Sequence, residues 1–223
     1  MVNANELTTD EAICGWGDEG LAAFDYNTYD SSHPMLRGFY YRLNFGVTIC
    51  NQYLTDYADA DATMTAEVRF LRALNYFELM DCFGNVPFTT VVSADKPQQI
   101  KRADLYKWIE SELLDIEGTL SEPKPKKEGE AGYGRVDKAA CWMLLSRLYL
   151  NAQVYTGTAQ WAKAAEYAKK VMDSPYKLYT TDKTDPSSQT WSAYQQLFMG
   201  HNGTTAASVE AVFPIIHTGL TPT

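Results

Sequence analysis

The sequence predicts a mainly α protein built from stacked helical hairpins, and two observations support this. Apolar residues recur at helical spacing from about residue 35 to residue 175. Glycine or proline stands where these runs stop, as at Gly84 and Pro175, so several separate helices are expected. Within one domain we therefore expect a loop-rich segment over 1–34, helical hairpins over 35–175 and a mixed tail over 176–223.

Composition limits the kinds of partner. The chain has 223 residues with 45% hydrophobic and 13% aromatic content, enough for a sizeable core. Its formal charge of -9 and pI near 4.8 argue against nucleic acid, because such binding relies on clustered Lys and Arg. The 15 Tyr and 5 Trp are amphipathic and suit neutral polar ligands such as sugars, although most of them are expected to be core.

The first two helices are expected over about 35–57 and from residue 62 onward. Apolar residues of the first helix share one face: Phe39, Leu43, Val47 and Cys50. The second helix has a buried face and ends at Gly84, with Pro87 close behind. Its buried residues are Phe70, Ala73, Leu74, Phe77 and Met80.

The third and fourth helices are separated by a polar connection over 121–135, rich in Pro, Gly, Lys and Glu. The third helix, over about 103–120, carries an apolar stripe of Leu105, Ile109, Leu113, Ile116 and Leu120. The fourth begins after Asp137, a good N-cap. One side of it carries Cys141, Leu144, Leu145, Leu148 and Ala152.

A fifth helix over about 159–173 completes a hairpin with the fourth. Its inward face is predicted to hold Trp161, Ala164, Ala165, Ala168 and Met172. The fourth helix partly matches the first helix of the tetratricopeptide repeat, with Trp142, Leu145, Ser146 and Tyr149 at the repeat's positions. Because Ser146 and the alanines are small, the two helices can approach closely. We therefore expect tetratricopeptide-like stacked hairpins.

The last region is expected to change character. Trp191–Met199 is predicted as a short helix, and Val209–Ile216 as a strand. Because a lone strand cannot satisfy its backbone groups, its partner is expected elsewhere in the chain or beyond its end.

No reaction centre is evident. The chain has no G-x-S-x-G, H-E-x-x-H or phosphate-binding G-x-x-x-x-G-K-[ST] pattern, and its 3 His are scattered. Its 4 Cys show no C-x-x-C pairing, which argues against a zinc site. Acidic neighbours such as Asp10-Glu11 and Asp18-Glu19 do not provide the carboxylate separation of a glycosidase. We expect no catalytic residue, no metal site and no cofactor.

The second predicted helix resembles the central motif of the SusD/RagB family of outer-membrane nutrient-binding lipoproteins. In that motif a helix with glutamate, arginine, aromatic, leucine, arginine and alanine runs into phenylalanine-glycine-x-x-proline, as Glu67 to Pro87 does here. Further similar stretches are Tyr40-Tyr41-Arg42, Trp108 to Leu113 and Gly134 to Ala140. The resemblance runs from Thr9 to Phe213.

The resemblance implies a tetratricopeptide-like scaffold whose loops bind oligosaccharides without catalysis. It also implies a place at the outer-membrane surface, as the lid of a SusC-like TonB-dependent transporter, with attachment through a lipid anchor. The first residues lack an export signal and a lipid-bearing cysteine, and known members are longer. We therefore expect this chain to be the amino-terminal portion, truncated at both ends.

Candidate ligand residues follow from the resemblance. The family's starch-binding prototype has a tryptophan and, three residues later, an asparagine before its tyrosine-tyrosine-arginine helix. Alignment on Tyr40-Tyr41-Arg42 places Tyr29 and Ser32 there, so weaker binding or a different glycan is expected. Trp16 and Tyr26 are secondary candidates in the same loop. The alternative for each aromatic is a packing role that fixes the loop to the helices.

Three function classes remain open, in the order glycan capture for import, helical-repeat adaptor for proteins, and glycoside hydrolase. Arg69 and Arg72 are predicted to be structural, because a guanidinium can link a helix to neighbouring carboxylates or carbonyl groups.

Overall fold

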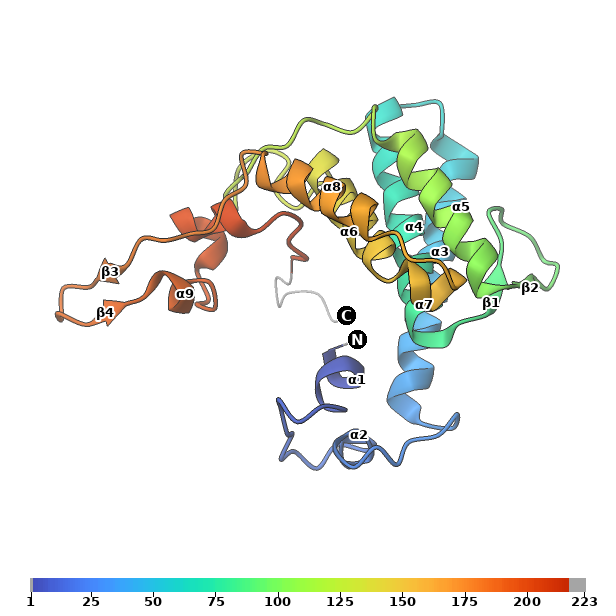
Figure 1. The fold of residues 1–223 in the computed structure, drawn as a ribbon, viewed down its shortest axis with the longest axis horizontal. Helices are drawn as coiled ribbons and strands as arrows, with labels where there is room; N and C mark the ends of the chain where they lie inside the picture. Colours follow the sequence, from blue (N-terminus) through green and yellow to red (C-terminus); the bar gives the residue numbers. More distant parts are fainter. Residues whose placement is uncertain (1, 217–223) are drawn as a thin grey trace.

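A computed structural model describes residues 2–216 of the chain. Its centre is a helical body, from which an amino-terminal segment (residues 2–33) and an arm (residues 177–199) extend in different directions (Figure 1). The body is formed by α3 (Pro34–Tyr57), α4 (Ala62–Phe83), α5 (Arg102–Ile116), α6 (Lys138–Leu150), α7 (Ala152–Thr156) and α8 (Trp161–Met172). The mainly α prediction is confirmed.

The hairpin of α3 and α4 contains the motif helix. Asp61 caps α4 by accepting a hydrogen bond from the Met64 backbone N–H at 2.8 Å, and Gly84 ends the helix at a φ of 73°. A Cβ at Gly46 would lie 2.5 Å from Asn75 Oδ1, so a glycine at this point of α3 lets the two helices approach closely. The predicted buried faces are confirmed, except that Phe39 and Leu74 are only partly buried.

A short antiparallel pair, β1 (Val86–Phe88) and β2 (Gln98–Ile100), connects α4 to α5, with Val86 opposite Ile100. The sequence analysis predicted the end of the helix at Gly84 but not this strand pair. The third helix is confirmed, and its whole predicted stripe is buried. Since Leu105, Ile109 and Leu113 are fully enclosed, α5 forms the middle of the core.

Helices α6 and α8 form the predicted hairpin. Asp137 caps α6, as predicted, by accepting from the backbone N–H groups of Ala139 and Ala140 at 2.9 and 3.2 Å. The Ser146 hydroxyl donates to the Ala164 carbonyl at 2.9 Å, which requires the close helix approach inferred from small residues.

The predicted inward face of α8 is wrong in part. Trp161 and Met172 are 61% and 79% exposed, Ala165 is exposed and Ala168 is half-buried, whereas Ala164 is buried as expected. The buried residues that share its face are Tyr167 and Val171. Tyr167 turns this face inward because its ring packs 5.6 Å from Tyr149 and its hydroxyl donates to Glu117. The prediction that the alanines face the core therefore placed the buried face of α8 incorrectly around the helix axis.

The tail follows its prediction only in part. A helix does lie within Trp191–Met199, as α9 (Ala193–Gln196), but the strand over Val209–Ile216 is wrong. That region contains a 3-10 helix, η2 (Ala206–Glu210), and then irregular chain. The Glu210 carboxylate accepts from the Tyr179 backbone N–H, and Phe213 packs on Phe70 of α4, so side-chain contacts hold it in place of strand pairing.

Three further elements lie in the tail. These are β3 (Lys183–Thr184), β4 (Thr190–Trp191) and the 3-10 helix η1 (Asn202–Thr204). The strands β3 and β4 pair in the arm, so the only strands near the described end form this small hairpin.

The amino-terminal segment has more structure than the predicted loop. It contains α1 (Val2–Glu6) and α2 (Leu21–Asp25), and their side chains form a small core separate from that of the body. This core consists of Leu7, Leu21 and Phe24, with Met35 and Leu36 of α3 packed against it. The segment is thus anchored on the first turn of α3. Within residues 2–216, no helix combines the length and apolar character needed to cross a membrane.

Candidate functional site

A hollow of about 750 Å³ lies where the amino-terminal segment meets the start of α3 and the end of α4. We call it the tyrosine hollow. Its lining residues are Ala4, Asn5, Phe24, Tyr29, Asp30, Ser31, Leu36, Arg37, Phe39, Tyr40, Tyr41, Cys82 and Phe83. It combines aromatic surface with a few polar groups, as small-molecule sites commonly do.

The loop that carries Tyr29 is fixed at both ends. His33 caps α3: its Nδ1 accepts from the Leu36 backbone N–H at 3.3 Å, and its Nε2 lies 2.9 Å from the Gly20 carbonyl, to which it donates. Gly20 has a φ of 93°, and a Cβ there would lie 2.7 Å from His33 Nε2. Phe24 is 1% exposed, and its ring packs at a tilt against that of His33, with the centroids 4.3 Å apart. Contacts within the chain therefore hold the loop beside the hollow.

Aromatic side chains form its walls. Tyr29 is 42% exposed, with its ring 5.5 Å from that of Phe24. Tyr40 packs edge-on against Phe83 at 5.2 Å, while Tyr41 is 63% exposed. Each tyrosine offers a flat apolar face and a hydroxyl group.

Polar groups stand beside these rings. The Asp30 carboxylate accepts from the Ser32 hydroxyl at 2.7 Å and from the Ser32 backbone N–H at 2.8 Å, and these bonds lower the pKa of Asp30. Asp30 is therefore an anionic acceptor at neutral pH. Arg37 lies one turn into α3, and no ion pair within residues 2–216 engages its guanidinium. The hollow thus offers a carboxylate acceptor and a guanidinium donor to hydroxyls, besides the tyrosine hydroxyl groups.

The hollow takes in one of the four predicted ligand residues, Tyr29. Ser32 is not among the lining residues and instead orients Asp30. Trp16 and Tyr26 are 78% and 74% exposed and also lie outside the lining. Neither packs as a buried anchor, so the structure does not assign them the alternative packing role.

Sequence reasoning missed Asp30, Arg37, Tyr40 and Tyr41 as lining residues. The last three lie within four positions on one helix, and Tyr40 and Tyr41 belong to the motif used for alignment. Helical spacing alone would have placed them on a common face. Asp30 carried no such signal, because a loop has no fixed period.

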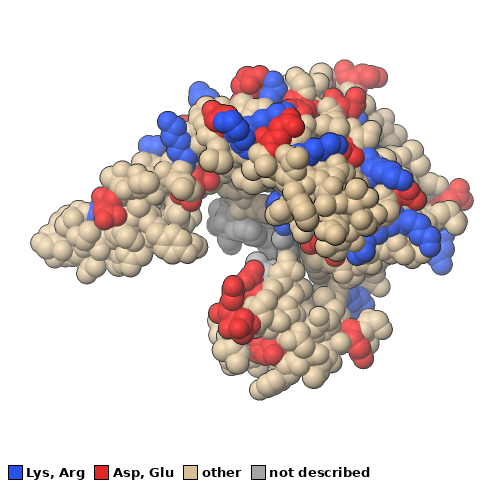
Figure 2. Space-filling model, in the orientation of Figure 1, with Lys and Arg blue, Asp and Glu red and all other residues tan. Residues whose placement is uncertain are grey.

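Charge in the amino-terminal segment has one sign. Residues 2–32 contain Asp and Glu but no Lys or Arg, and Figure 2 shows red side chains on this lower part of the molecule. These residues are Glu6, Asp10, Glu11, Asp18, Glu19, Asp25 and Asp30. A polyanionic ligand would be repelled here.

Metal and thiol chemistry find little support in the described part of the chain. Across residues 2–216, no three His, Cys, Asp or Glu side chains are grouped so that they could hold a metal ion. The cysteines Cys14, Cys50, Cys82 and Cys141 are free. Burial raises the pKa of Cys82, which lines the hollow, to about 11, so this thiol is not ionised at neutral pH.

Comparisons with known proteins identify the family of the chain. Residues 25–150, more than half of the chain, match a SusD-like family described as starch-binding and associating with the outer membrane. The chain is 38% identical over 224 residues to the starch-binding protein SusD of Bacteroides thetaiotaomicron. That alignment covers 98% of this chain and 38% of the relative, so the chain spans well under half the relative's length.

Solved structures share the fold. A laminarin-binding SusD-like protein is 26% identical with a TM-score of 0.63, over 79% of this chain and 38% of that one. A SusD superfamily protein from Parabacteroides distasonis is 24% identical with a TM-score of 0.67, over 89% of this chain and 42% of that one. The predicted tetratricopeptide-like fold and the inferred resemblance are both confirmed. The chain belongs to the SusD-like family of starch-binding proteins that associate with the outer membrane.

Proposed function

We propose that this protein binds oligosaccharides without turnover at the outer-membrane surface, and that it does so in the tyrosine hollow. The observation that carries the proposal is the exposed Tyr29 ring facing a hollow of about 750 Å³ in a member of a glycan-binding family. Its relatives include one named for starch and one for laminarin.

The chemistry of the hollow suits a neutral sugar. One face of a pyranose presents C–H groups that pack on an aromatic ring, and its edge presents hydroxyl groups. Tyr29, Tyr40 and Tyr41 supply rings, while Asp30 and Arg37 supply an acceptor and a donor for the hydroxyls. The acidic amino-terminal segment disfavours uronic or sulfated sugars.

Binding without hydrolysis is favoured by the number of carboxylates. A glycosidase of the usual kind needs two carboxyl groups about 5–9.5 Å apart across the bond that breaks. Asp30 is the one carboxylate among the residues that line the hollow in the described part of the chain. A capturing role therefore fits the lining better than a hydrolase does.

We further propose that the protein hands its ligand to a SusC-like TonB-dependent transporter and is held at the membrane by a lipid anchor. Both proposals rest on family membership. Co-purification with a β-barrel transporter, lost when the adjacent transporter gene is deleted, would support the first. Incorporation of a labelled fatty acid into the full-length protein would support the second, and its failure would argue against an anchor.

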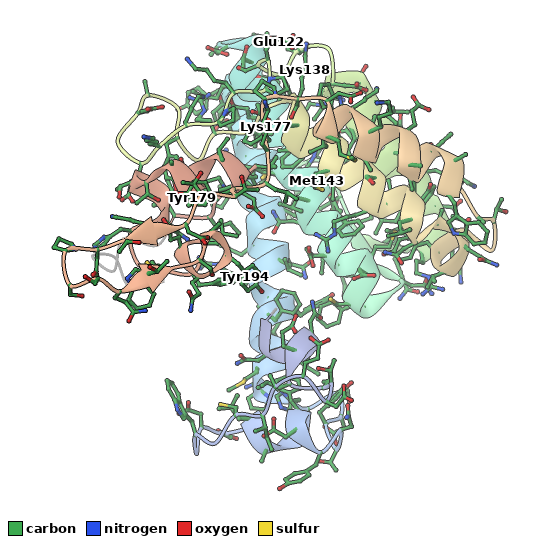
Figure 3. All side chains as sticks on the ribbon, turned by 60° about the vertical axis from the view of Figure 1, so that its left-hand side comes forward. Glu122, Lys138, Met143, Lys177, Tyr179 and Tyr194 are labelled. Carbon is green, nitrogen blue, oxygen red and sulfur yellow. The ribbon has the colours of Figure 1, made fainter. Side chains whose placement is uncertain are left out.

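Calorimetric titration of the full chain tests the binding proposal. We expect saturable heat with at least one neutral glucan oligosaccharide and no release of reducing sugar. Replacing Tyr29 by Ala should weaken binding about fivefold, because one stacked ring contributes about 1 kcal/mol. Tyr194→Ala is the matched control, since this tyrosine is 70% exposed on the arm, outside the hollow (Figure 3). Equal losses in both variants would contradict the assignment.

A further inference from the structure

The outer face of α3 carries large apolar side chains that the described part of the chain leaves exposed. Phe45 and Ile49 are 58% and 53% exposed, and Tyr53, one turn further on, is half-buried. The buried residues of α3 lie on the opposite side of the helix, where α4 packs. We call the exposed face the α3 stripe and define it by Arg42, Phe45, Ile49, Tyr53 and Asp56.

The middle of the α3 stripe has no charged residue, although it is exposed. Residues 43–55 contain no Asp, Glu, Lys or Arg. The exposed face of a helix usually carries charged and polar side chains, opposite the apolar face that packs on the core. Apolar surface that polar residues border is typical of an interaction site. The α3 stripe therefore indicates a surface that binds another molecule.

The charges that border the α3 stripe have opposite signs and lie equally far from its centre. Arg42 precedes Ile49 by seven residues, and Asp56 follows Ile49 by seven. Seven residues are nearly two helical turns, so both side chains lie within about 20° of Ile49 around the helix axis. Phe45 and Tyr53 stand one turn before and one turn after Ile49. A reversed copy of the stripe therefore presents Asp56 to Arg42 and Tyr53 to Phe45.

Both charged groups can take part in such a contact. Arg42 and Asp56 are exposed, and no ion pair within residues 2–216 engages either of them. The Asp56 carboxylate accepts a hydrogen bond from the Gln52 side chain of the same helix at 2.6 Å. A carboxylate has two oxygens with about four acceptor positions, so Asp56 can still accept from a guanidinium. Figure 1 shows that the start of α3 extends beyond the other helices of the body.

We propose that the α3 stripe binds a second copy of this chain, with the two α3 helices antiparallel and a two-fold axis at Ile49. Arg42 of each protomer pairs with Asp56 of its partner, and Phe45 packs on Tyr53 of its partner. The two-fold axis makes each of these contacts twice. Because one pair of helices forms a small interface, the dimer is reversible. No residue of the stripe lines the tyrosine hollow, so the proposal does not depend on glycan binding.

Sedimentation velocity of the full chain over a series of concentrations tests this proposal. We expect an equilibrium between monomer and dimer. Ile49→Glu places two carboxylates at the two-fold axis and should raise the dissociation constant of the dimer at least about tenfold. Leu150→Glu is the matched control, because this leucine is 58% exposed on α6. It should change the dissociation constant less than about twofold.

Charge reversal tests the pairing and the antiparallel arrangement. Arg42→Asp and Asp56→Arg each place like charges opposite one another at two symmetric positions, and each should weaken self-association about tenfold. Mixed in equal amounts, the two variants should associate as tightly as the wild type, because each protomer then supplies the charges that the other needs. A monomer at every concentration, a dimer that Ile49→Glu leaves intact, or a mixture that associates no more tightly than either variant alone would each overturn the proposal.

Discussion

The arginines of the motif helix show how a conspicuous residue can be structural. Arg69 pairs with Glu112 at 2.8 Å and with Asp115 at 2.7 Å. Arg72, only 7% exposed, pairs with Glu112 at 2.9 Å and donates to the Asn51 side chain at 3.0 Å. These contacts join α3, α4 and α5. The sequence-based prediction of a linking role for both arginines is therefore confirmed.

Glu112 is the shared partner, and replacing it should be costly. Glu112→Gln leaves Arg72 buried without its counter-charge, and we expect the free energy of unfolding at pH 7 to fall by about 3–5 kcal/mol. Urea denaturation monitored by circular dichroism measures the change. Lys169→Gln is a suitable control, because its pair with Asp173 is exposed and should contribute less than about 1 kcal/mol.

The same variant predicts a pH dependence. Burial alone raises the pKa of Glu112, but the hydrogen bonds from Arg69 and Arg72 outweigh it, so the net pKa is lowered. The contribution of Glu112 is thus complete above its ordinary pKa of about 4.3 and is lost as pH falls through the lower folded-state pKa. The stability gap between wild type and Glu112→Gln should narrow between pH 5 and pH 3. A gap that stays constant would contradict the pairing.

At the scale of elements, periodicity predicted the helices well where one stripe dominates. In α5 the leucines and isoleucines define a single apolar face, and the structure buries this predicted face. In α8 the alanines and Tyr167 offered two possible faces, and only contact with Tyr149 decides between them. The prediction of a strand at 209–216 is wrong for a related reason. A short apolar run fits a strand or an irregular segment equally well, and Glu210 and Phe213 find tertiary partners instead.

Helical periodicity could have predicted the candidate site only at its helical residues Arg37, Tyr40 and Tyr41. Tyr29 came from alignment to a motif, whereas the loop position of Asp30 depends on the contact of His33 with Gly20, distant in sequence. Trp16 lies outside the hollow because of the path that its loop takes, and the sequence of a loop has no periodic pattern that would predict this path. Local sequence patterns do not encode such paths.

The amino-terminal segment should unfold separately from the helical body. Phe24 belongs to its small core rather than to the main one. Phe24→Ala should therefore cost about 3–5 kcal/mol locally. In hydrogen exchange, the backbone amides of residues 3–33 should lose protection, while those of α4 should stay protected. Glycan binding should weaken in parallel, because Tyr29 loses its support.

A matching substitution in the same segment serves as the control for Phe24. Ile13 is 80% exposed, so Ile13→Ala should leave exchange unchanged. Loss of protection throughout α3 and α4 in the Phe24 variant would show that the segment and the body unfold as one unit.

On the scale of the whole molecule, the tyrosine hollow depends on the packing of α4. The hollow lies at the junction with the amino-terminal segment, and the end of α4 contributes Cys82 and Phe83 to its lining. Whatever loosens the packing of α4 should therefore disturb the proposed glycan binding.

Phe77 tests that dependence. It is 1% exposed at the centre of α4, against Tyr155 at 6.4 Å and beneath the guanidinium of Arg147. Phe77→Ala leaves a cavity and should lower the free energy of unfolding by about 3–5 kcal/mol, a large part of a typical total. Phe45→Ala, at a phenylalanine 58% exposed on α3, should cost less than about 1 kcal/mol. Thermal melts of the two variants decide the matter, since equal melting temperatures would mean that Phe77 is not part of the core on which the tyrosine hollow depends.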